Sequence, residues 1–336
     1  MTRTAFSVTD VSAALGTPVA AIEVLDTFVA SEAEVVRLRL RRTDGSSTTV
    51  IGKRATGAGA TAARQEIRFF QQLAPQWNHP APRLLGFQNH GDDVLLLSED
   101  LGAMRYHVVG TEVSDAQLHG TIDVLADFHA QFWNDVPDYL SGASEPSVTS
   151  TAQAWPPDVI TRNADAVRGE AERFFATTPE LEPAERSVLA EVVDAWERQF
   201  RARVADGRAI TLVHGDFHFL GNIFFTTGDP RPKVIDWSEL KPGLAPHDLA
   251  YCLTVVPSNN RLSRDRELLR RYWEALRKAG VNDYSWDLCY WDFRFSVISN
   301  LFQSVFQRSV RWYRTSLAAI DLLDGRTTLT SKPPLL

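Results

Sequence analysis

The sequence predicts an α+β protein with a small β-rich N-terminal lobe and a mainly helical C-terminal lobe. The chain has 336 residues, 44% of them hydrophobic, and one core usually stops growing at roughly 250–300 residues. Short runs of alternating apolar residues lie before residue 100, whereas helical periodicity dominates after it. We therefore expect an N-terminal lobe at 1–100 and a C-terminal lobe at 101–336.

The first three predicted strands form a meander over residues 21–30, 34–42 and 48–56. In the second strand apolar residues alternate with arginines, as in a half-buried strand, and a Thr-Asp-Gly turn follows it. The third strand carries Lys53.

Residues 61–75 have apolar residues at helical spacing and end at a proline, so we expect a helix there that carries Glu66. The runs 83–90 and 93–101 flank a turn and predict a hairpin. After a first helical turn, five antiparallel strands and one helix should thus fill residues 20–100.

The C-terminal lobe shows helical periodicity over residues 115–133, 183–204, 265–280 and 284–306. A stretch rich in Pro, Ser and Thr at 141–158 interrupts it and predicts a surface loop. Selectivity for a ligand is expected to reside in this lobe and this loop.

Composition excludes several classes of protein. A formal net charge of −7 argues against a nucleic-acid partner and leaves cationic small molecules open. No apolar run approaches membrane-spanning length, and the N-terminus does not resemble a signal peptide. Cys252 and Cys289 lie in apolar surroundings, which favours buried thiols in a reducing compartment. We expect a cytoplasmic protein without a membrane partner.

One loop combines residue types that a purely structural loop seldom needs. The stretch HGDFHFLGN at 214–222 lies between two apolar runs, and a predicted hairpin brings back a second acid in VIDW at 234–237. Asp216, Asn222 and Asp236 would form an oxygen-rich cluster, which suits a hard cation such as Mg²⁺.

These pieces resemble the aminoglycoside phosphotransferase and choline kinase-like superfamily. The similar segments are HGDFHFLGN, VIDW, HDLA at 247–250 and SEDL at 98–101, together with Lys53 and Glu66. Each piece alone is weak, but all occur in the family's order between residues 30 and 250. The resemblance implies a bilobal, protein-kinase-like fold.

The resemblance also implies a reaction, the transfer of the γ-phosphate of ATP or GTP to a hydroxyl of a small acceptor with Mg²⁺. Lys53 would hold the nucleotide phosphates and Glu66 would hold Lys53. Asp216 would accept the proton of the acceptor hydroxyl, while Asn222 and Asp236 would carry the metal.

Other residues are expected to support these roles. His214 should brace the loop through hydrogen bonds, Asp248 should anchor it, and His218 either faces the acceptor or packs beneath it. Ser31 could offer a hydroxyl to the phosphates. The nucleotide is also expected to contact Ser98, Glu99, Asp100 and Leu101, mostly through the backbone.

Only eleven residues separate Asp236 from Asp248, too few for the activation segment of a protein kinase. The acceptor should therefore be a small hydroxylated molecule, such as an aminoglycoside or other antibiotic, an amino sugar or a choline-like alcohol. The aromatic residues of 284–313 could contact a ring-bearing or cationic acceptor or simply pack in the core. Both a monomer and a homodimer remain open.

Two features depart from the family pattern. Asn222 follows Asp216 by six residues, whereas the kinase-type loop has five, and we expect Gly221 to absorb the extra residue in a glycine-specific conformation. The loop at 29–34 has no glycine and carries Glu32 and another glutamate, which would repel a triphosphate if turned inward. The alternative function is a degenerate kinase-fold protein that binds a small ligand without phosphoryl transfer.

Overall fold

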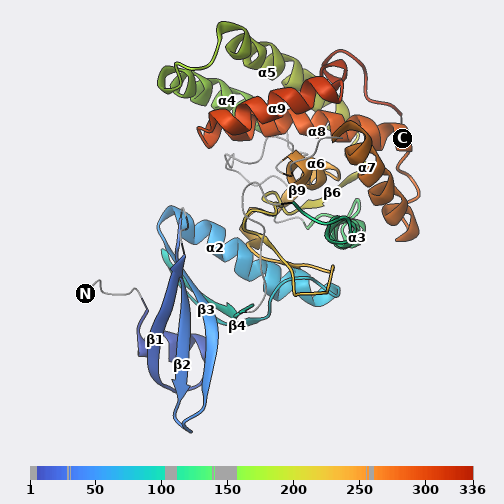
Figure 1. The fold of residues 1–336 in the computed structure, drawn as a ribbon. Coiled ribbons are helices and arrows are strands. Elements are labelled where there is room, and N and C mark those ends of the chain that lie inside the picture. The colour runs from blue at the N-terminus through green and yellow to red at the C-terminus, as the bar shows by residue number, and fades with distance from the viewer. Residues whose placement is uncertain are drawn as a thin grey trace. The chain divides into compact units, whose positions relative to one another are not determined.

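The computed structural model describes residues 6–28, 30, 32–102, 112–137, 140, 157–254, 256 and 261–335. The chain divides into two compact units (Figure 1). The first unit is Met1–Arg105 with Lys233–Glu239, and the second is Tyr106–Pro232 with Leu240–Leu336. The segment Lys233–Glu239 thus groups with the first unit, whereas the sequence-based division assigned it to the C-terminal lobe.

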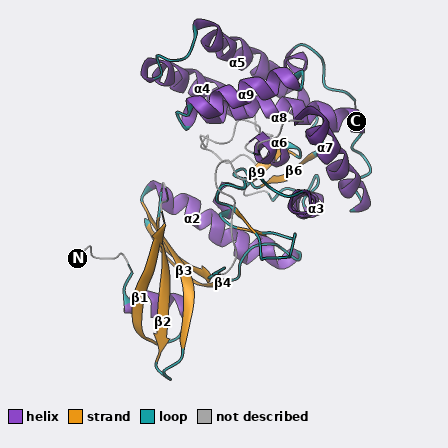
Figure 2. Ribbon diagram, viewed as in Figure 1, coloured by secondary structure: helices purple, strands orange, loops and turns teal. Residues whose placement is uncertain are grey.

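The first unit contains the predicted five-stranded antiparallel sheet, with strand order β1-β2-β3-β5-β4. Figure 2 shows these strands in orange. Their bounds are Val19–Phe28 (β1), Glu34–Arg42 (β2), Ser47–Thr56 (β3), Leu84–His90 (β4) and Asp93–Glu99 (β5).

The two faces of this sheet are covered by two different helices, α1 (Val8–Leu15) and α2 (Ala58–Arg68). Strand β5 has apolar side chains on both faces of the sheet, because successive side chains of a strand point to opposite faces. Leu95 and Leu97 belong to the cluster that includes α1, whereas Leu96 belongs to the cluster that includes α2. A strand covered on both faces reads as a continuous apolar run, as this one does.

Helix α2 differs from the predicted helix at both ends. It begins three residues earlier than expected, and after Arg68 it continues as a π-helical turn (η1, Phe69–Leu73) and a 3₁₀ turn (η2, Ala74–Gln76). Pro75 lacks the backbone N–H that another α-helical turn would need. Near the start of α2, a Cβ on Gly59 would lie 2.2 Å from the carbonyl oxygen of Glu32, so this backbone approach requires glycine.

The second unit is mainly helical, as predicted. Its helices are α3 (Asp115–Gln131), α4 (Pro157–Thr177), α5 (Pro183–Val204), α6 (His247–Thr254), α7 (Arg261–Lys278), α8 (Trp286–Phe306), α9 (Val310–Leu322) and the 3₁₀ turn η4 (Gly325–Leu329). Two of its short strands, β6 (Ile210–Val213) and β9 (Lys241–Leu244), pair antiparallel. The remaining short elements are β7 (Ile223–Phe224) here and, in the first unit, β8 (Lys233–Val234) and the 3₁₀ turn η3 (Trp237–Glu239).

Helix α8 forms the centre of the second unit. It packs against α4, α6, α7 and α9, and most of its residues are buried. Trp291 and Phe295 stack on one another, and Phe295 also stacks on Trp196 of α5. These two aromatic side chains of the 284–313 stretch therefore pack in the core.

The predicted loop at 141–158 lies largely outside the described residues, and its last two residues already begin α4. Both cysteines are buried free thiols, as expected, and burial raises the pKa of each. Across the described ranges, the helices are either too short or too polar to traverse a bilayer.

Candidate active site

Three charged side chains of the first unit form one cluster, here called the Lys53 cluster. Nζ of Lys53 lies 2.8 Å from Oε2 of Glu66 and 2.8 Å from Oδ1 of Asp236. The expected contact between Lys53 and Glu66 is therefore present, and the contact with Asp236 is additional. Glu66 is buried, while the side chain of Asp236 is 37% exposed.

Local structure places the members of this cluster. Lys53 lies on β3 between Val35 of β2 and Leu96 of β5 in the strand register, and Glu66 lies near the end of α2. Burial, the largest single effect, lowers the pKa of Lys53, but the carboxylates of Glu66 and Asp236 raise it above its usual value overall. The lysine is thus charged throughout the neutral pH range.

Asp236 is held in an uncommon backbone conformation with a φ of 63°. Its neighbour Trp237 is buried and stacks on Phe69, with ring centroids 4.1 Å apart. The indole Nε1 of Trp237 also donates to the carbonyl oxygen of Val234 at 3.0 Å. These contacts anchor the backbone on both sides of Asp236, and Ser238 donates to Oδ1 of Asp236 at 2.8 Å.

The predicted nucleotide contacts at 98–101 follow the end of β5. The side chain of Asp100 accepts hydrogen bonds from Nε of Arg37 and from the backbone N–H of Gly102. It is engaged within the first unit, so a nucleotide contact of this segment would use its backbone. Ser31 lies outside the described residues.

In the second unit, residues 214–222 form a loop between β6 and β7, here called the Asp216 loop. The Asp216 carboxylate receives hydrogen bonds at both oxygens. Tyr251 of α6 donates from Oη to Oδ1 at 3.0 Å, and Asn222 donates from Nδ2 to Oδ2 at 2.8 Å. Asn222 Nδ2 also donates to the backbone carbonyl of Asp216 at 2.8 Å, so neither donation uses the amide oxygen of Asn222.

His218 adds a third neighbour to this carboxylate. Its Nδ1 accepts a hydrogen bond from the backbone N–H of Leu220 at 3.1 Å, so the ring proton belongs on Nε2. Nε2 lies 3.6 Å from Oδ2 of Asp216. Burial, the largest single effect, raises the pKa of Asp216, but its neighbours, first of all His218, lower it below its usual value overall.

Asp248 at the start of α6 holds the beginning of the loop. It is fully buried and accepts hydrogen bonds from the backbone N–H groups of His214 (2.7 Å) and Gly215 (2.9 Å). These are the contacts that the sequence suggested. Burial, the largest single effect, raises the pKa of Asp248, but the hydrogen bond with His129 and the nearby histidines together outweigh it, and the pKa falls to about 2.

The extra residue between Asp216 and Asn222 is not absorbed as expected. Gly221 does not adopt a positive φ, and a Cβ there would make an ordinary 3.6 Å contact with His218. A turn takes up the length instead, in which the backbone N–H of Asn222 donates to the carbonyl oxygen of His218 at 3.3 Å. The glycine of this loop with a positive φ is Gly215, at 86°.

The structure brings in three residues to which the sequence analysis assigned no role. Tyr251 contacts Asp216, His129 contacts Asp248, and Trp237 anchors Asp236. Tyr251 follows Asp248 by three residues on α6, so helical spacing from the HDLA segment could have indicated that both face the same loop.

Residues 29–284 match the phosphotransferase enzyme family, APH. The chain belongs to this family. The matched residues include both the Lys53 cluster and the Asp216 loop. The protein is a phosphotransferase of the superfamily that its motifs indicated.

Solved structures of phosphotransferases share the fold. A protein named as an aminoglycoside phosphotransferase from Ralstonia eutropha JMP134 is 15% identical, with 92% of this chain and 93% of that chain covered and a TM-score of 0.56. Macrolide 2′-phosphotransferase MphH from Brachybacterium faecium is 17% identical, with 93% and 97% covered and a TM-score of 0.50. Choline kinase LicA from Streptococcus pneumoniae is 12% identical, with 93% and 94% covered and a TM-score of 0.50. No curated protein was found to match the sequence.

Proposed function

We propose that the protein transfers the γ-phosphate of ATP or GTP to a hydroxyl group of a small acceptor. The observation that carries this proposal is the Asp216 carboxylate, held at both oxygens inside the segment that matches the phosphotransferase family. A carboxylate in such a loop can accept a hydrogen bond, and then the proton, from an attacking hydroxyl.

In the proposed reaction the acceptor hydroxyl oxygen attacks the γ-phosphorus. The bond from that phosphorus to the bridging oxygen breaks, the nucleoside diphosphate leaves, and the hydroxyl proton passes to Asp216. The lowered pKa of Asp216 keeps it ionised at neutral pH and makes it a weak base. A weak base suffices because phosphoryl transfer depends mostly on positioning and on charge stabilisation.

Lys53 would contact the nucleotide phosphates, and Glu66 would keep its side chain in place. The Lys53 cluster has one positive and two negative charges, so it is net negative before a nucleotide binds. A polyphosphate would be repelled by this excess of negative charge unless a cation accompanies it.

The donor set fits Mg²⁺. Asp236 and Asn222 offer a carboxylate and an amide oxygen, and Mg²⁺ is usually bound by one or two carboxylates, waters and substrate phosphates. Within the described part of the chain, no group of three or more His, Cys, Asp or Glu side chains could hold a metal. That agrees with a metal held partly by the nucleotide, where it would neutralise phosphate charge.

The acceptor class we propose is a small hydroxylated molecule, with aminoglycosides and other antibiotics, amino sugars and choline-like alcohols as candidates. The net charge of −7 is compatible with a cationic acceptor. We propose no nucleic-acid or membrane partner, and either a monomer or a homodimer.

A transfer screen tests the proposal. The full chain is incubated with Mg²⁺, either ATP or GTP, and one acceptor at a time from these classes, and phosphorylated products are identified by ³¹P NMR and mass spectrometry. At least one acceptor should be phosphorylated faster than the nucleotide is hydrolysed without acceptor, and Asp216→Asn should form that product roughly 10²- to 10⁴-fold more slowly. Nucleotide binding without transfer to any acceptor would instead favour the degenerate kinase-fold alternative.

A further inference from the structure

We propose that Tyr251 is a positioning residue for phosphoryl transfer, which fixes the orientation of the Asp216 carboxylate through its phenolic hydroxyl. This inference rests on the proposed function, because it assigns Asp216 to the acceptor hydroxyl. The contact on which it depends is the 3.0 Å hydrogen bond from Tyr251 Oη to Asp216 Oδ1.

The two oxygens of Asp216 are held from different elements. Oδ2 contacts Asn222 and His218, which belong to the same loop as Asp216 and can move with it. Oδ1 contacts Tyr251 on α6. The hydroxyl of Tyr251 therefore fixes the orientation of the Asp216 carboxylate relative to α6, a helix outside the loop. The contacts to Oδ2 come from within the loop and cannot do this.

Helix α6 is well suited to this task because it is fixed at both ends. At its first turn, Asp248 accepts from the backbone of His214 and Gly215, so the helix holds the loop at two points three residues apart. One carboxylate binds the loop backbone, and one hydroxyl binds the Asp216 side chain.

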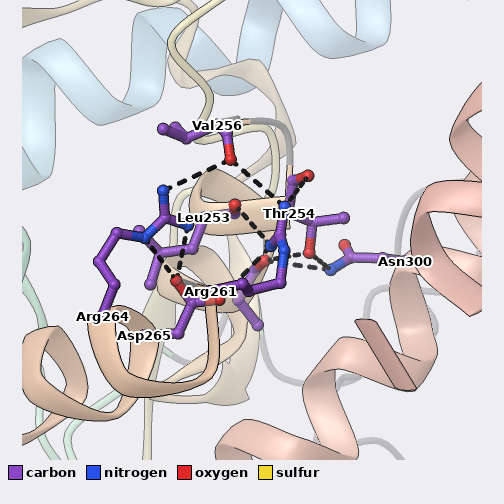
Figure 3. A network of polar contacts seen from close by, with 8 residues as sticks. Leu253, Thr254, Val256, Arg261, Arg264, Asp265 and Asn300 are labelled. Carbon is purple, nitrogen blue, oxygen red and sulfur yellow. Dashed lines mark hydrogen bonds and ion pairs between the residues drawn. The ribbon is translucent and has the colours of Figure 1, made fainter. Parts of the chain in front are cut away.

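A buried polar network fixes the other end of α6 (Figure 3). Arg261 donates to the carbonyl oxygens of Leu253 and Thr254 at the C-terminal end of the helix, where carbonyl groups lack intrahelical partners. Asp265 pairs with Arg261 and Arg264, and its side chain is 1% exposed. Asn300 donates to Thr254 Oγ1 at 2.9 Å. The network joins α6 to α7 and α8, which limits any shift of Tyr251.

The phenol ring itself packs in place without its hydroxyl. It meets the His218 ring edge-on, with centroids 5.8 Å apart, and lies 5.4 Å from the Trp312 ring. Tyr251 is 6% exposed. Tyr251→Phe keeps these ring contacts and removes only the hydroxyl, so it separates the positioning role from packing.

The test compares the steady-state kinetics of wild type and Tyr251→Phe. We expect kcat to fall about tenfold, the loss of one hydrogen bond to a charged group, while the KM for nucleotide stays within twofold. A kcat within twofold of wild type would overturn the proposal. So would a rise in the nucleotide KM that matches the loss in kcat, since that indicates a general disturbance.

A matched variant guards against a purely structural effect. Tyr313 is fully buried, and its hydroxyl donates to the carbonyl oxygen of Glu185 at 2.8 Å, so Tyr313→Phe removes a comparable hydroxyl away from Asp216. It should leave kcat within twofold of wild type. A loss of kcat in Tyr313→Phe as large as that in Tyr251→Phe would contradict the proposal.

A crystallographic comparison tests the inference independently of activity. In Tyr251→Phe the Asp216 carboxylate should rotate or occupy more than one orientation, while the Tyr313→Phe structure keeps it as in wild type. An unchanged Asp216 in Tyr251→Phe would refute the positioning role even if the enzyme is active. If wild type phosphorylates no acceptor, the proposed function fails, and the crystal structures still decide the role of Tyr251.

Discussion

The Lys53 cluster and the Asp216 loop hold their central charges in opposite ways. Lys53 is a cation paired with two carboxylates, and all three groups carry full charge. Asp216 is a carboxylate held by a phenol, an amide and an imidazole. The first arrangement depends on the balance of charges, whereas the second depends on the directions of hydrogen bonds.

This difference suggests what each site can tolerate. Ion pairs act over several ångströms and constrain angles weakly, so in the proposed function the Lys53 cluster would accept a polyphosphate and a metal by redistributing its contacts. Hydrogen bonds fix the plane of a carboxylate, so the Asp216 side chain, which is 28% exposed, would present one oxygen face to the proposed acceptor. The variants below separate charge balance from geometry, in order of decreasing expected effect.

The largest expected effect comes from Asp216→Asn. We expect turnover to fall roughly 10²- to 10⁴-fold, the usual contribution of a positioned base, while nucleotide affinity and folding are kept. Coupled kinetics, calorimetric nucleotide titration and thermal melts measure these quantities. Asp194→Asn, at a side chain that is 75% exposed, serves as the control. Turnover within a few-fold of wild type would remove Asp216 from the role of base.

The Lys53 cluster should respond through nucleotide binding instead. We expect Lys53→Met to lower kcat/KM for nucleotide about 10²-fold, as loss of a preorganised charge does, and Glu66→Gln to lower it about tenfold, because Glu66 acts through Lys53. The double variant should resemble Lys53→Met alone, since the second change has nothing left to act on. Losses that multiply would show that the two residues act independently.

Asp248→Asn probes the support of the Asp216 loop through pH. The carboxyl of Asp248 has a pKa of about 2 against an ordinary value of 3.8. A depressed pKa stabilises the fold above pH 4, and that stabilisation is lost as the pH falls through the folded value. It amounts to roughly 2 kcal/mol, so Asp248→Asn should be less stable by about that amount at pH 7.

Urea unfolding between pH 7 and the lowest pH at which wild type folds measures this difference. The gap between wild type and Asp248→Asn should narrow below about pH 4. A gap that stays constant down to pH 3 would mean that Asp248 contributes by shape rather than by charge.

The smallest effects distinguish the two glycines of the Asp216 loop. Gly215 has a φ of 86°, so Gly215→Ala should destabilise the fold by about 1 kcal/mol or more. A Cβ at Gly221 would make only an ordinary contact, so Gly221→Ala should lie within about 0.5 kcal/mol of wild type. Urea melts of both variants measure the contrast, and equal losses would contradict the assignment of the strained position.

The sheet could be predicted from sequence because its signals are local. Alternation in the strands, a proline at the end of the helix and turn residues between strands each act over a few positions. The contact between Lys53 and Glu66 was also foreseeable, because adjacent elements carry both residues. Helices α4, α6 and α9 were missed. The clearest local signal near α4 was the composition of the loop that precedes it.

Contacts between distant segments were harder to foresee. Asp236 lies 183 positions from Lys53, and the motif reasoning directed it to the metal rather than to the lysine. Tyr251 was overlooked because nothing in its local sequence distinguishes a core tyrosine from one that donates to a carboxylate. The prediction that Gly221 adopts a left-handed conformation was wrong for another reason. Any glycine permits such a conformation, and only the fold determines which glycine adopts it.

The left-handed backbone at Asp236 distinguishes aspartate from glutamate. The charge requirement of the cluster could be met by either acid. The backbone requirement favours aspartate, because short polar side chains tolerate a φ of 63° far better than longer ones do. Two requirements therefore act on position 236, a negative charge beside Lys53 and a left-handed backbone. Asp236→Glu would keep the charge but would still strain the fold.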